Sequence, residues 1–315
     1  MAQPDPNPGA ASPEIETRTL RIESADGASV DGTLRHGLEA APGAPVWLIS
    51  PAMGVRATFY RRLAEALARR GHPSLTADLR GLGTSSVRAS RRSDFGYREM
   101  VELDFPARLR ALGEAFPGRA IHGLGHSLGG QLTCLAVARL AHLDETDIPR
   151  PRALTLVASC SIYYRSWPGL SRYGTLGFYQ FAKVLGAIFG YFPGHRVGFG
   201  DREARRVIDD WYHQGTTGRY RLRGSELDYE SLLREVRLPT FALSFTDDPY
   251  CPAAATEHLL GKMESPSRLH RVQSPADLGV QKLGHFGWIH HAEAVADRLL
   301  DGTAHVTQMG PGPKS

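Results

Sequence analysis

The sequence predicts an α/β fold, with a mainly parallel central sheet flanked by helices and an inserted helical cap. Three observations support this prediction. The 315 residues, 42% of them hydrophobic, suit one large globular unit with a sizeable core. Strand and helix patterns alternate through the first half, which is typical of a parallel sheet covered on both faces. This alternation stops over residues 162–236 and then resumes.

The first two predicted strands lie on either side of a turn at Asp26-Gly27. Residues 17–22 and 29–35 alternate apolar with polar side chains, so we expect an antiparallel pair at the edge of the sheet. The other expected strands are short apolar runs at residues 45–49, 74–77, 120–124, 153–158, 240–245 and 269–272. The expected helices are one from Phe59 that stops at Gly71, and others near 101–116, 128–141, 253–263 and 288–300.

Residues 162–236 form the predicted cap, an aromatic-rich segment with Gly and Pro interruptions and no clear strand. Within it, residues 176–192 are mostly apolar and barely reach the lower length limit of a membrane span. Their apolar side chains recur at helical spacing on one side, namely Phe178, Phe181, Leu185, Ile188 and Phe192. We therefore expect an amphipathic helix packed on the protein through this face, and no integral membrane segment.

The remaining ranges complete the predicted organisation. Residues 15–161 and 237–300 are expected to form the α/β core. Residues 1–14 lack a basic start and an apolar run, so we interpret them as a disordered lead rather than a secretory signal. Residues 301–315 are small and polar and predict a flexible tail.

Charge and cysteine content limit the class of protein. Lys and Arg number 37 against 33 Asp and Glu, and they are scattered, which argues against nucleic-acid binding. Cys134, Cys160 and Cys251 fit neither a disulfide framework nor a zinc site. A reducing compartment, the cytoplasm, is therefore expected. The sequence leaves open whether the chain forms a homodimer.

The segment Gly125-His126-Ser127-Leu128-Gly129 lies between an apolar strand and a helical pattern. A sharp strand-to-helix turn would project the Ser127 hydroxyl as a nucleophile, and the two glycines would avoid collisions with neighbouring backbone. A plain glycine-rich turn is the structural alternative. The helix that follows places the Leu128 amide where it could hold an oxyanion.

A serine nucleophile needs a base and a residue that orients the base. Asp247 and Asp248 follow the strand at 240–245, and we prefer Asp248 as the orienting acid with Asp247 as second choice. Both could instead cap a helix that starts at Ala253. His285 stands in a glycine-flanked loop before the last helix and is the expected base. No histidines have H-E-x-x-H spacing, so we expect no catalytic metal.

A second oxyanion donor and a substrate pocket are also predicted. The loop after the strand at 45–49 begins Ser50-Pro51, and proline has no N–H, so Ala52 is preferred as donor and Met53 is second choice. The expected pocket residues, from the elbow, the oxyanion loop, the cap and the His285 loop, are His126, Met53, Tyr163, Trp167, Phe178 and Phe286.

These motifs resemble those of the α/β-hydrolase superfamily, and the resemblance covers the chain from about Glu16 to Leu300. The run from Asp78 to Ser85 is similar to the D-x-R-G-x-G-x-S loop of that family. A branch of predicted bacterial α/β hydrolases is similar at Phe59-Tyr60-Arg61, Gly190-Tyr191-Phe192-Pro193-Gly194, Asp210-Trp211 and Gly284-His285-Phe286-Gly287. That branch implies the α/β-hydrolase fold but no substrate. Many members begin the oxyanion loop with His-Gly, where this sequence has Ser50-Pro51.

The sequence thus predicts a serine hydrolase, carboxylesterase-like, that uses no cofactor and acts on a small acyl substrate with an apolar portion. An acyltransferase or thioesterase with the same triad is the alternative. Four arginines near the cap could then hold a phosphate-bearing carrier, namely Arg196, Arg202, Arg205 and Arg206. A non-catalytic ligand receptor and a lipase with residues 176–192 at a membrane surface are two further alternatives.

Overall fold

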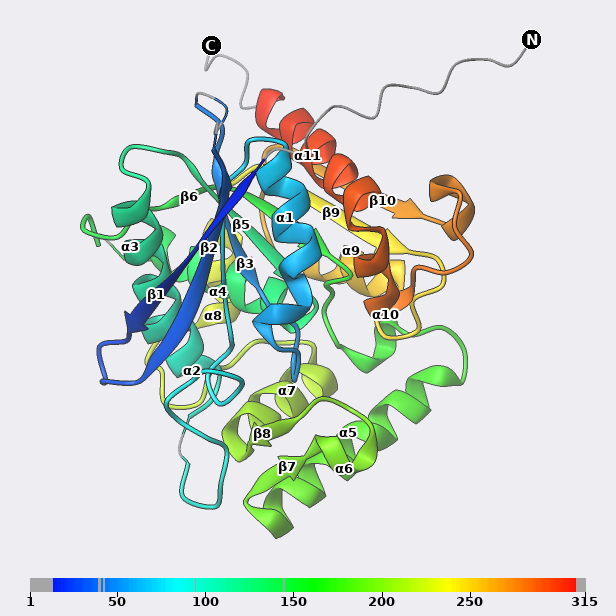
Figure 1. Ribbon diagram of the computed structural model, residues 1–315. Coiled ribbons are helices and arrows are strands. Elements are labelled where there is room, and N and C mark those ends of the chain that lie inside the picture. The colour runs from blue at the N-terminus through cyan, green and yellow to red at the C-terminus, as the bar shows by residue number, and fades with distance from the viewer. Residues whose placement is uncertain (1–13, 39–40, 42, 94, 144, 310–315) are drawn as a thin grey trace.

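A computed structural model describes residues 14–38, 41, 43–93, 95–143 and 145–309 (Figure 1). Its centre is an eight-stranded sheet in the order β1-β2-β4-β3-β5-β6-β9-β10. The strands are β1 (Ile15–Glu23), β2 (Ser29–Gly37), β3 (Val46–Ser50), β4 (Ser74–Ala77), β5 (Ile121–His126), β6 (Pro151–Val157), β9 (Thr240–Phe245) and β10 (Arg268–Gln273). Strand β2 is antiparallel to both β1 and β4, and all other neighbours are parallel. The predicted fold class is confirmed, and the antiparallel pair lies at the edge of the sheet as expected.

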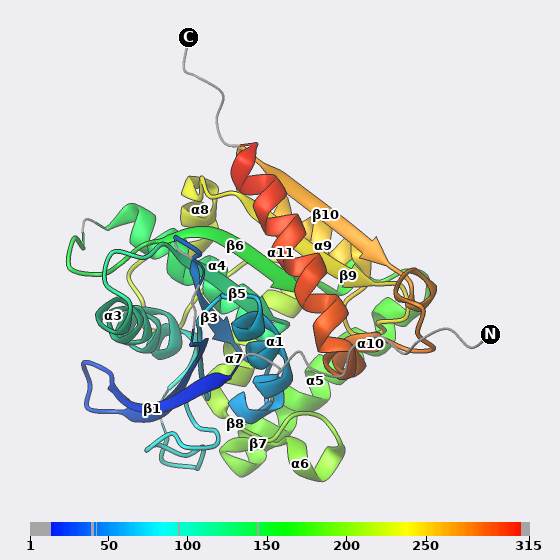
Figure 2. The same cartoon turned by 45° about the horizontal axis from the view of Figure 1, so that its top comes forward.

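Helices cover both faces of this sheet. Helices α1 (Arg61–Arg69) and α11 (Ala292–Gln308) lie on one face, and α3 (Phe105–Ala115), α4 (Leu128–His142) and α9 (Ala253–Leu260) lie on the other (Figures 1 and 2). Every residue of β3, β4, β5 and β9 is buried as a result. Burial therefore does not alternate along these strands, as expected of strands covered on both faces.

Short helical turns join the main elements. They are η1 (Ala57–Tyr60), α2 (Tyr97–Glu99), the π-helical η2 (Met100–Asp104), α8 (Tyr229–Leu232), η4 (Leu233–Glu235), η5 (Pro275–Leu278), α10 (Gly284–Gly287) and η6 (Trp288–His291). The helix expected at 101–116 is therefore α3 preceded by a wider π-helical turn. His285 lies in the single turn of α10 rather than in a loop.

The segment between β6 and β9 contains a separate layer at the carboxyl ends of the parallel strands, in the lower part of Figure 1. Its elements are η3 (Tyr164–Ser166), α5 (Ser171–Phe189), β7 (Tyr191–Pro193), α6 (Gly194–Val197), β8 (Arg202–Ala204) and α7 (Arg205–Thr217). Strands β7 and β8 pair antiparallel, in a segment where no strand was expected. With three residues each, they are too short for a periodic pattern. Helix α8 and turn η4 pack on α4 instead of joining this layer.

The predicted buried face of α5 is only partly confirmed: Phe178 and Leu185 pack against the core, but Phe181 and Ile188 do not. Its buried residues are Tyr179, Ala182 and Gly186, whereas Phe181 is 45% and Ile188 57% exposed. Small residues at 182 and 186 let α7 approach closely, and that contact outweighs the apolar periodicity on the other side. Phe192 lies beyond the helix in β7. No helix in the described part of the chain is long and apolar enough to cross a membrane.

The flexible tail was predicted to begin at residue 301, which is too early. Helix α11 continues to Gln308 because its last turns are buried against the sheet. The Thr303 hydroxyl lies 2.7 Å from that of Thr155 in β6, and Val306 is fully buried. The expected lead lies outside the described residues except for Glu14, as do residues 310–315 of the tail.

The D-x-R-G-x-G-x-S loop after β4 has a structural role in the described contacts. The Asp78 carboxylate accepts hydrogen bonds from the amides of Ala57 (2.7 Å) and Thr84 (2.9 Å). Arg80 is almost fully buried and forms ion pairs with Asp104 and Asp26. These contacts fix the start of η1 and the edge hairpin, and so the loop that leads into the site.

Candidate active site

Ser127 stands at a sharp turn between β5 and α4. Its φ is +53°, a value that few non-glycine residues adopt. A Cβ at Gly129 would lie 2.1 Å from the Ser50 carbonyl oxygen, and one at Gly125 would lie 2.3 Å from the Cα of Gly130. The two glycines therefore permit a turn that any side chain would block, as the sequence predicted.

A chain of hydrogen bonds links Ser127, His285 and Asp248. The Nδ1 atom of His285 lies 2.8 Å from Oδ2 of Asp248, and its Nε2 atom lies 2.9 Å from Oγ of Ser127. Because a carboxylate only accepts, Nδ1 carries the proton and Nε2 is free to accept one from the serine. His285 and Asp248 are both buried, at 7% and 5% exposure. The structure thus brings together the three residues that were chosen from sequence.

The two neighbouring acids have different partners. Oδ1 of Asp248 accepts the amides of Tyr250 (2.8 Å) and Cys251 (3.1 Å), which fixes the carboxylate that faces His285. Asp247 instead accepts the amides of Leu283 (2.9 Å) and Gly284 (3.0 Å). Burial alone would raise the pKa of Asp247, but these amides outweigh it and hold the pKa below its ordinary value. Asp248 contacts the imidazole, and Asp247 holds the backbone before it.

The amides near the Ser127 hydroxyl differ in availability. Leu128 is the first residue of α4, so its N–H has no acceptor within the helix. The Ala52 N–H donates to the hydroxyl of Tyr60 at 2.8 Å. The preference for Ala52 as oxyanion donor is therefore wrong, because its N–H is already engaged. Met53 is the next residue of the same loop and lines the cavity over Ser127.

His126 does not line the cavity, contrary to the prediction. It is fully buried beneath it, with Nδ1 2.8 Å from the Tyr60 hydroxyl and Nε2 2.9 Å from the His285 carbonyl oxygen. The Trp288 indole donates to the same carbonyl at 3.0 Å. Burial and the nearby His285 hold the pKa of His126 well below its ordinary value, so it is neutral. The His126 contacts depend on long-range packing, which the sequence pattern did not reveal.

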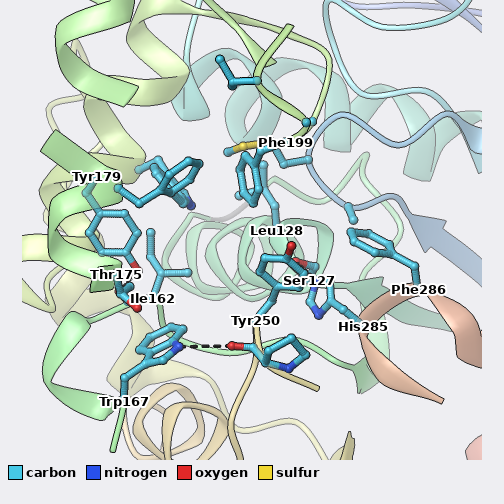
Figure 3. Close-up of a pocket in the computed structure, with 18 of the residues that line it drawn as sticks. Ser127, Leu128, Ile162, Trp167, Thr175, Tyr179, Phe199, Tyr250, His285 and Phe286 are labelled. Atoms are coloured by element: carbon cyan, nitrogen blue, oxygen red, sulfur yellow. Dashed lines mark hydrogen bonds between the residues drawn. The ribbon is translucent and has the colours of Figure 1, made fainter. Parts of the chain in front are cut away.

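A cavity of about 460 Å³ lies between Ser127 and the cap. Figure 3 shows Ser127 and His285 on one side, facing Tyr179, Thr175 and Trp167 across it. Of the expected pocket residues, Met53, Trp167, Phe178 and Phe286 line it. Tyr163 does not: its ring packs on Gly218 and His258. The sequence missed several lining residues, chiefly Gln131, Ile162, Thr175, Tyr179, Phe199, Trp211 and Tyr250.

The cap arginines do not gather at the cavity. Arg202 stacks on the Tyr191 ring, and Arg206 pairs with Glu99. Arg196 and Arg205 are exposed, and among the described residues no arginine lines the cavity. The described residues likewise include no group of three potential metal ligands. All three cysteines are buried and unpaired with one another by disulfides.

Comparisons with known proteins agree with this architecture. The model of the alpha/beta hydrolase family matches residues 36–298. A ferulic acid-bound structure of Est1E from Butyrivibrio proteoclasticus is 15% identical, with a TM-score of 0.60, and 90% of this chain and 99% of that chain are covered. The alpha/beta hydrolase GrgF from Penicillium sp. sh18 is 16% identical, with a TM-score of 0.59 and coverage of 93% and 99%. A putative lipase from Acinetobacter baumannii AYE is 15% identical, with a TM-score of 0.58 and coverage of 94% and 93%. A comparison with curated proteins gives no match.

At these identities the solved structures support the fold alone. The family model, by contrast, spans most of the sequence, including the elbow, both acids and His285. The chain therefore belongs to the alpha/beta hydrolase family, which supports a hydrolase activity.

Proposed function

We propose that this chain is a serine hydrolase that cleaves a carboxylic ester, or a related acyl bond, through Ser127, His285 and Asp248. One observation carries the proposal. A continuous chain of hydrogen bonds of 2.8 and 2.9 Å runs from the Asp248 carboxylate through His285 to the Ser127 hydroxyl, which faces the cavity.

The proposed reaction has two stages. The Ser127 oxygen attacks the ester carbonyl carbon while His285 Nε2 takes the hydroxyl proton, and Asp248 stabilises the resulting imidazolium. The bond to the alcohol then breaks, and the alcohol leaves with the proton from His285. In the second stage, water attacks the acyl-enzyme, His285 takes a proton from it, and the carboxylic acid departs as the Ser127 hydroxyl re-forms.

The developing oxyanion needs two N–H donors. We assign these to Leu128, at the N-terminus of the fifteen-residue α4, and Met53, in the loop after β3. Met53 replaces Ala52 in this role because the Ala52 amide is bonded to Tyr60.

The cavity favours a neutral substrate with an apolar portion. Apart from His285, no ionisable group other than the Tyr179 and Tyr250 hydroxyls is among its described lining residues, and aromatic side chains from both core and cap form much of the wall. An acyltransferase or thioesterase would use the same triad. No observation favours it, however, because the four cap arginines lie away from the lining. The hydrogen-bonded triad gives no support to the receptor alternative. Cytoplasmic location stays a prediction from the sequence, and homodimer formation stays open.

Hydrolysis at a lipid surface is a second candidate, favoured by the outer face of α5. Three large apolar residues there, Phe181, Val184 and Ile188, are 45%, 52% and 57% exposed. Tyr173, about two turns before Phe181, is 62% exposed, and Gly174 and Thr175 of the same helix line the cavity. If α5 binds lipid, the protein should pellet with vesicles, and Phe181→Ser with Ile188→Ser should abolish pelleting without unfolding it. Equal recovery of wild type and variant in the supernatant would reject this candidate.

Labelling with a fluorophosphonate probe tests the main proposal. The wild type should react at Ser127, as located by peptide mapping, and Ser127→Ala and His285→Ala should not react. His290→Ala is the matched control, since His290 is exposed on the next turn and contacts Arg62. The proposal fails if folded wild-type protein remains unlabelled, or if Ser127→Ala labels as well as the wild type.

A further inference from the structure

The cavity wall contains few polar side chains, and most of these are already bonded. The Tyr179 hydroxyl donates to the Ile162 carbonyl at 2.6 Å, and the Trp167 indole donates to the Pro249 carbonyl at 3.3 Å. The Thr175 hydroxyl donates to a carbonyl one turn earlier in its own helix, at 3.1 Å. None of these three groups has a donor hydrogen left for a ligand.

Gln131 differs from them. It lies one helical turn after Ser127 in α4, is 2% exposed and lines the cavity. Its Oε1 accepts a hydrogen bond from the Tyr220 hydroxyl at 3.1 Å, which directs the other end of the amide away from Tyr220. Among the described residues, Gln131 Nε2 has no acceptor. Because Gln131 lines the cavity, this N–H can donate to a ligand there, and a ligand atom that accepts from it would be bound selectively.

Trp211 supplies a second donor from the opposite side. It lies in α7 of the cap, lines the cavity and is 6% exposed. Its ring packs edge-on against Tyr179, and within the described residues its indole N–H also has no acceptor. The cavity thus has N–H donors on the core and on the cap. No carboxylate lines its described wall, and no lysine or arginine there could balance an anion.

We propose that Gln131 selects substrates whose acyl chain carries a neutral oxygen acceptor, such as a ketone or ether, a few bonds from the reacting carbonyl. Residues one helical turn apart lie roughly 5–6 Å from one another, which places the acceptor in the acyl chain rather than at its far end. Trp211 is the second donor to the same class of substrate. This inference rests on the proposed ester hydrolysis at Ser127, and it adds a specificity of that reaction for the acyl chain.

An oxygen scan of the acyl chain tests the inference. The substrates are nitrophenyl hexanoate and its analogues in which one CH₂ at a time, from the third to the fifth carbon of the acyl chain, is replaced by an ether oxygen. The wild type should prefer one analogue over the all-carbon parent in kcat/KM, and Gln131→Leu should lower that preference about five- to tenfold. The oxygen activates the ester equally in both proteins, so the ratio of the two preferences isolates the contribution of Gln131.

Two further variants keep the test decisive. Gln131→Met provides a second donor-free side chain if Gln131→Leu does not fold. Thr175→Val is the matched control, because the Thr175 hydroxyl is already bonded within α5, and this variant should keep the wild-type preference.

The outcomes separate the two proposals. If the wild type hydrolyses the parent ester but no oxygen position gives a preference sensitive to Gln131, the inference fails and the hydrolase proposal stands. If no ester is hydrolysed and Ser127 is not labelled, both proposals fail.

Discussion

The Tyr60 hydroxyl donates a hydrogen bond of 2.8 Å to Nδ1 of the buried His126. The direction of this hydrogen bond follows from the other partners of Tyr60 and His126. The Ala52 amide donates to the Tyr60 oxygen, and His126 Nε2 donates to the His285 carbonyl. Burial raises the pKa of Tyr60, so its hydroxyl keeps its proton. This relay connects the loop that contains Met53 with the turn that contains His285.

Removal of the Tyr60 hydroxyl should therefore affect both stability and catalysis. Tyr60→Phe leaves the Ala52 amide and His126 Nδ1 buried without partners, so we expect a loss of about 1–3 kcal/mol in the free energy of unfolding. We also expect kcat to fall about tenfold with little change in KM, because the relay positions groups around the oxyanion. Urea denaturation and ester kinetics measure the two effects. Tyr212→Phe removes an exposed hydroxyl bonded to Gln180 and is the control; equal effects of the two variants would contradict the prediction.

Asn substitutions at Asp248 and Asp247 should separate the roles of the two acids. Asp248→Asn removes the carboxylate that orients His285, so kcat should fall by about 10³–10⁴. Asp247→Asn retains one acceptor for two amides, so we expect about 1–2 kcal/mol of destabilisation and at most about a tenfold loss of kcat. Steady-state kinetics and urea denaturation of both variants provide the measurement. The reverse order of kinetic effects would assign the triad acid to Asp247.

Glu203 should make stability depend on pH. It lies in β8, is 4% exposed, and burial raises its pKa from 4.5 to about 8. Because the folded-state pKa is raised, its contribution to stability is fully present below about pH 4.5 and is lost as pH rises through about 8. Glu203→Gln should therefore become more stable than the wild type by on the order of 2–5 kcal/mol between about pH 5 and pH 8.

Urea denaturation across this pH range checks the Glu203 prediction. The control is Glu226→Gln, which changes an exposed carboxylate. A stability difference between Glu203→Gln and the wild type that does not vary with pH would show that Glu203 does not titrate in this window.

Gly129→Ala should prevent the elbow from forming. The new methyl group would lie 2.1 Å from the Ser50 carbonyl oxygen, and backbone on both sides cannot yield. We expect a loss of more than about 3 kcal/mol, or failure to fold. Gly177→Ala is the matched control: nothing lies within 4 Å of its Cβ in α5, and alanine should stabilise that helix by about 0.5–1 kcal/mol. Thermal denaturation of the two variants compares them, and similar midpoints would contradict the prediction.

Local sequence patterns were sufficient to locate strands of the sheet and to select the candidate catalytic residues. Strands covered on both faces are buried at every position and contain mainly apolar and small residues, so β4 and β9 could be located to the residue. The elbow around Ser127 imposes steric demands within five residues, and these are visible as glycines. His285 and Asp248 could be chosen because each follows a strand in an order that the fold requires.

Contacts between distant segments decided which face of α5 is buried and where α11 ends. The sequence placed Phe181 and Ile188 inside, but the small residues Ala182 and Gly186 allow a closer contact with α7 and leave the larger side chains outside. Apolar periodicity shows that a helix has two sides, and only the neighbouring helix determines which side is buried. The end of α11 was misjudged in the same way, because Thr303 finds its partner in β6.

By itself, the sequence predicted the α/β architecture, the serine turn, and Ser127 and His285 as nucleophile and base, because each depends on local sterics or on strand order; it left the acid open between Asp248 and Asp247. Only the tertiary structure decided which amides remain free, that His126 lies beneath the site, and that Gln131 keeps an unpaired donor in the cavity. The physical reason is that a hydrogen-bonding group is available or engaged according to what lies next to it in space. Tyr60, Tyr220 and Trp288 reach the site from three different parts of the chain.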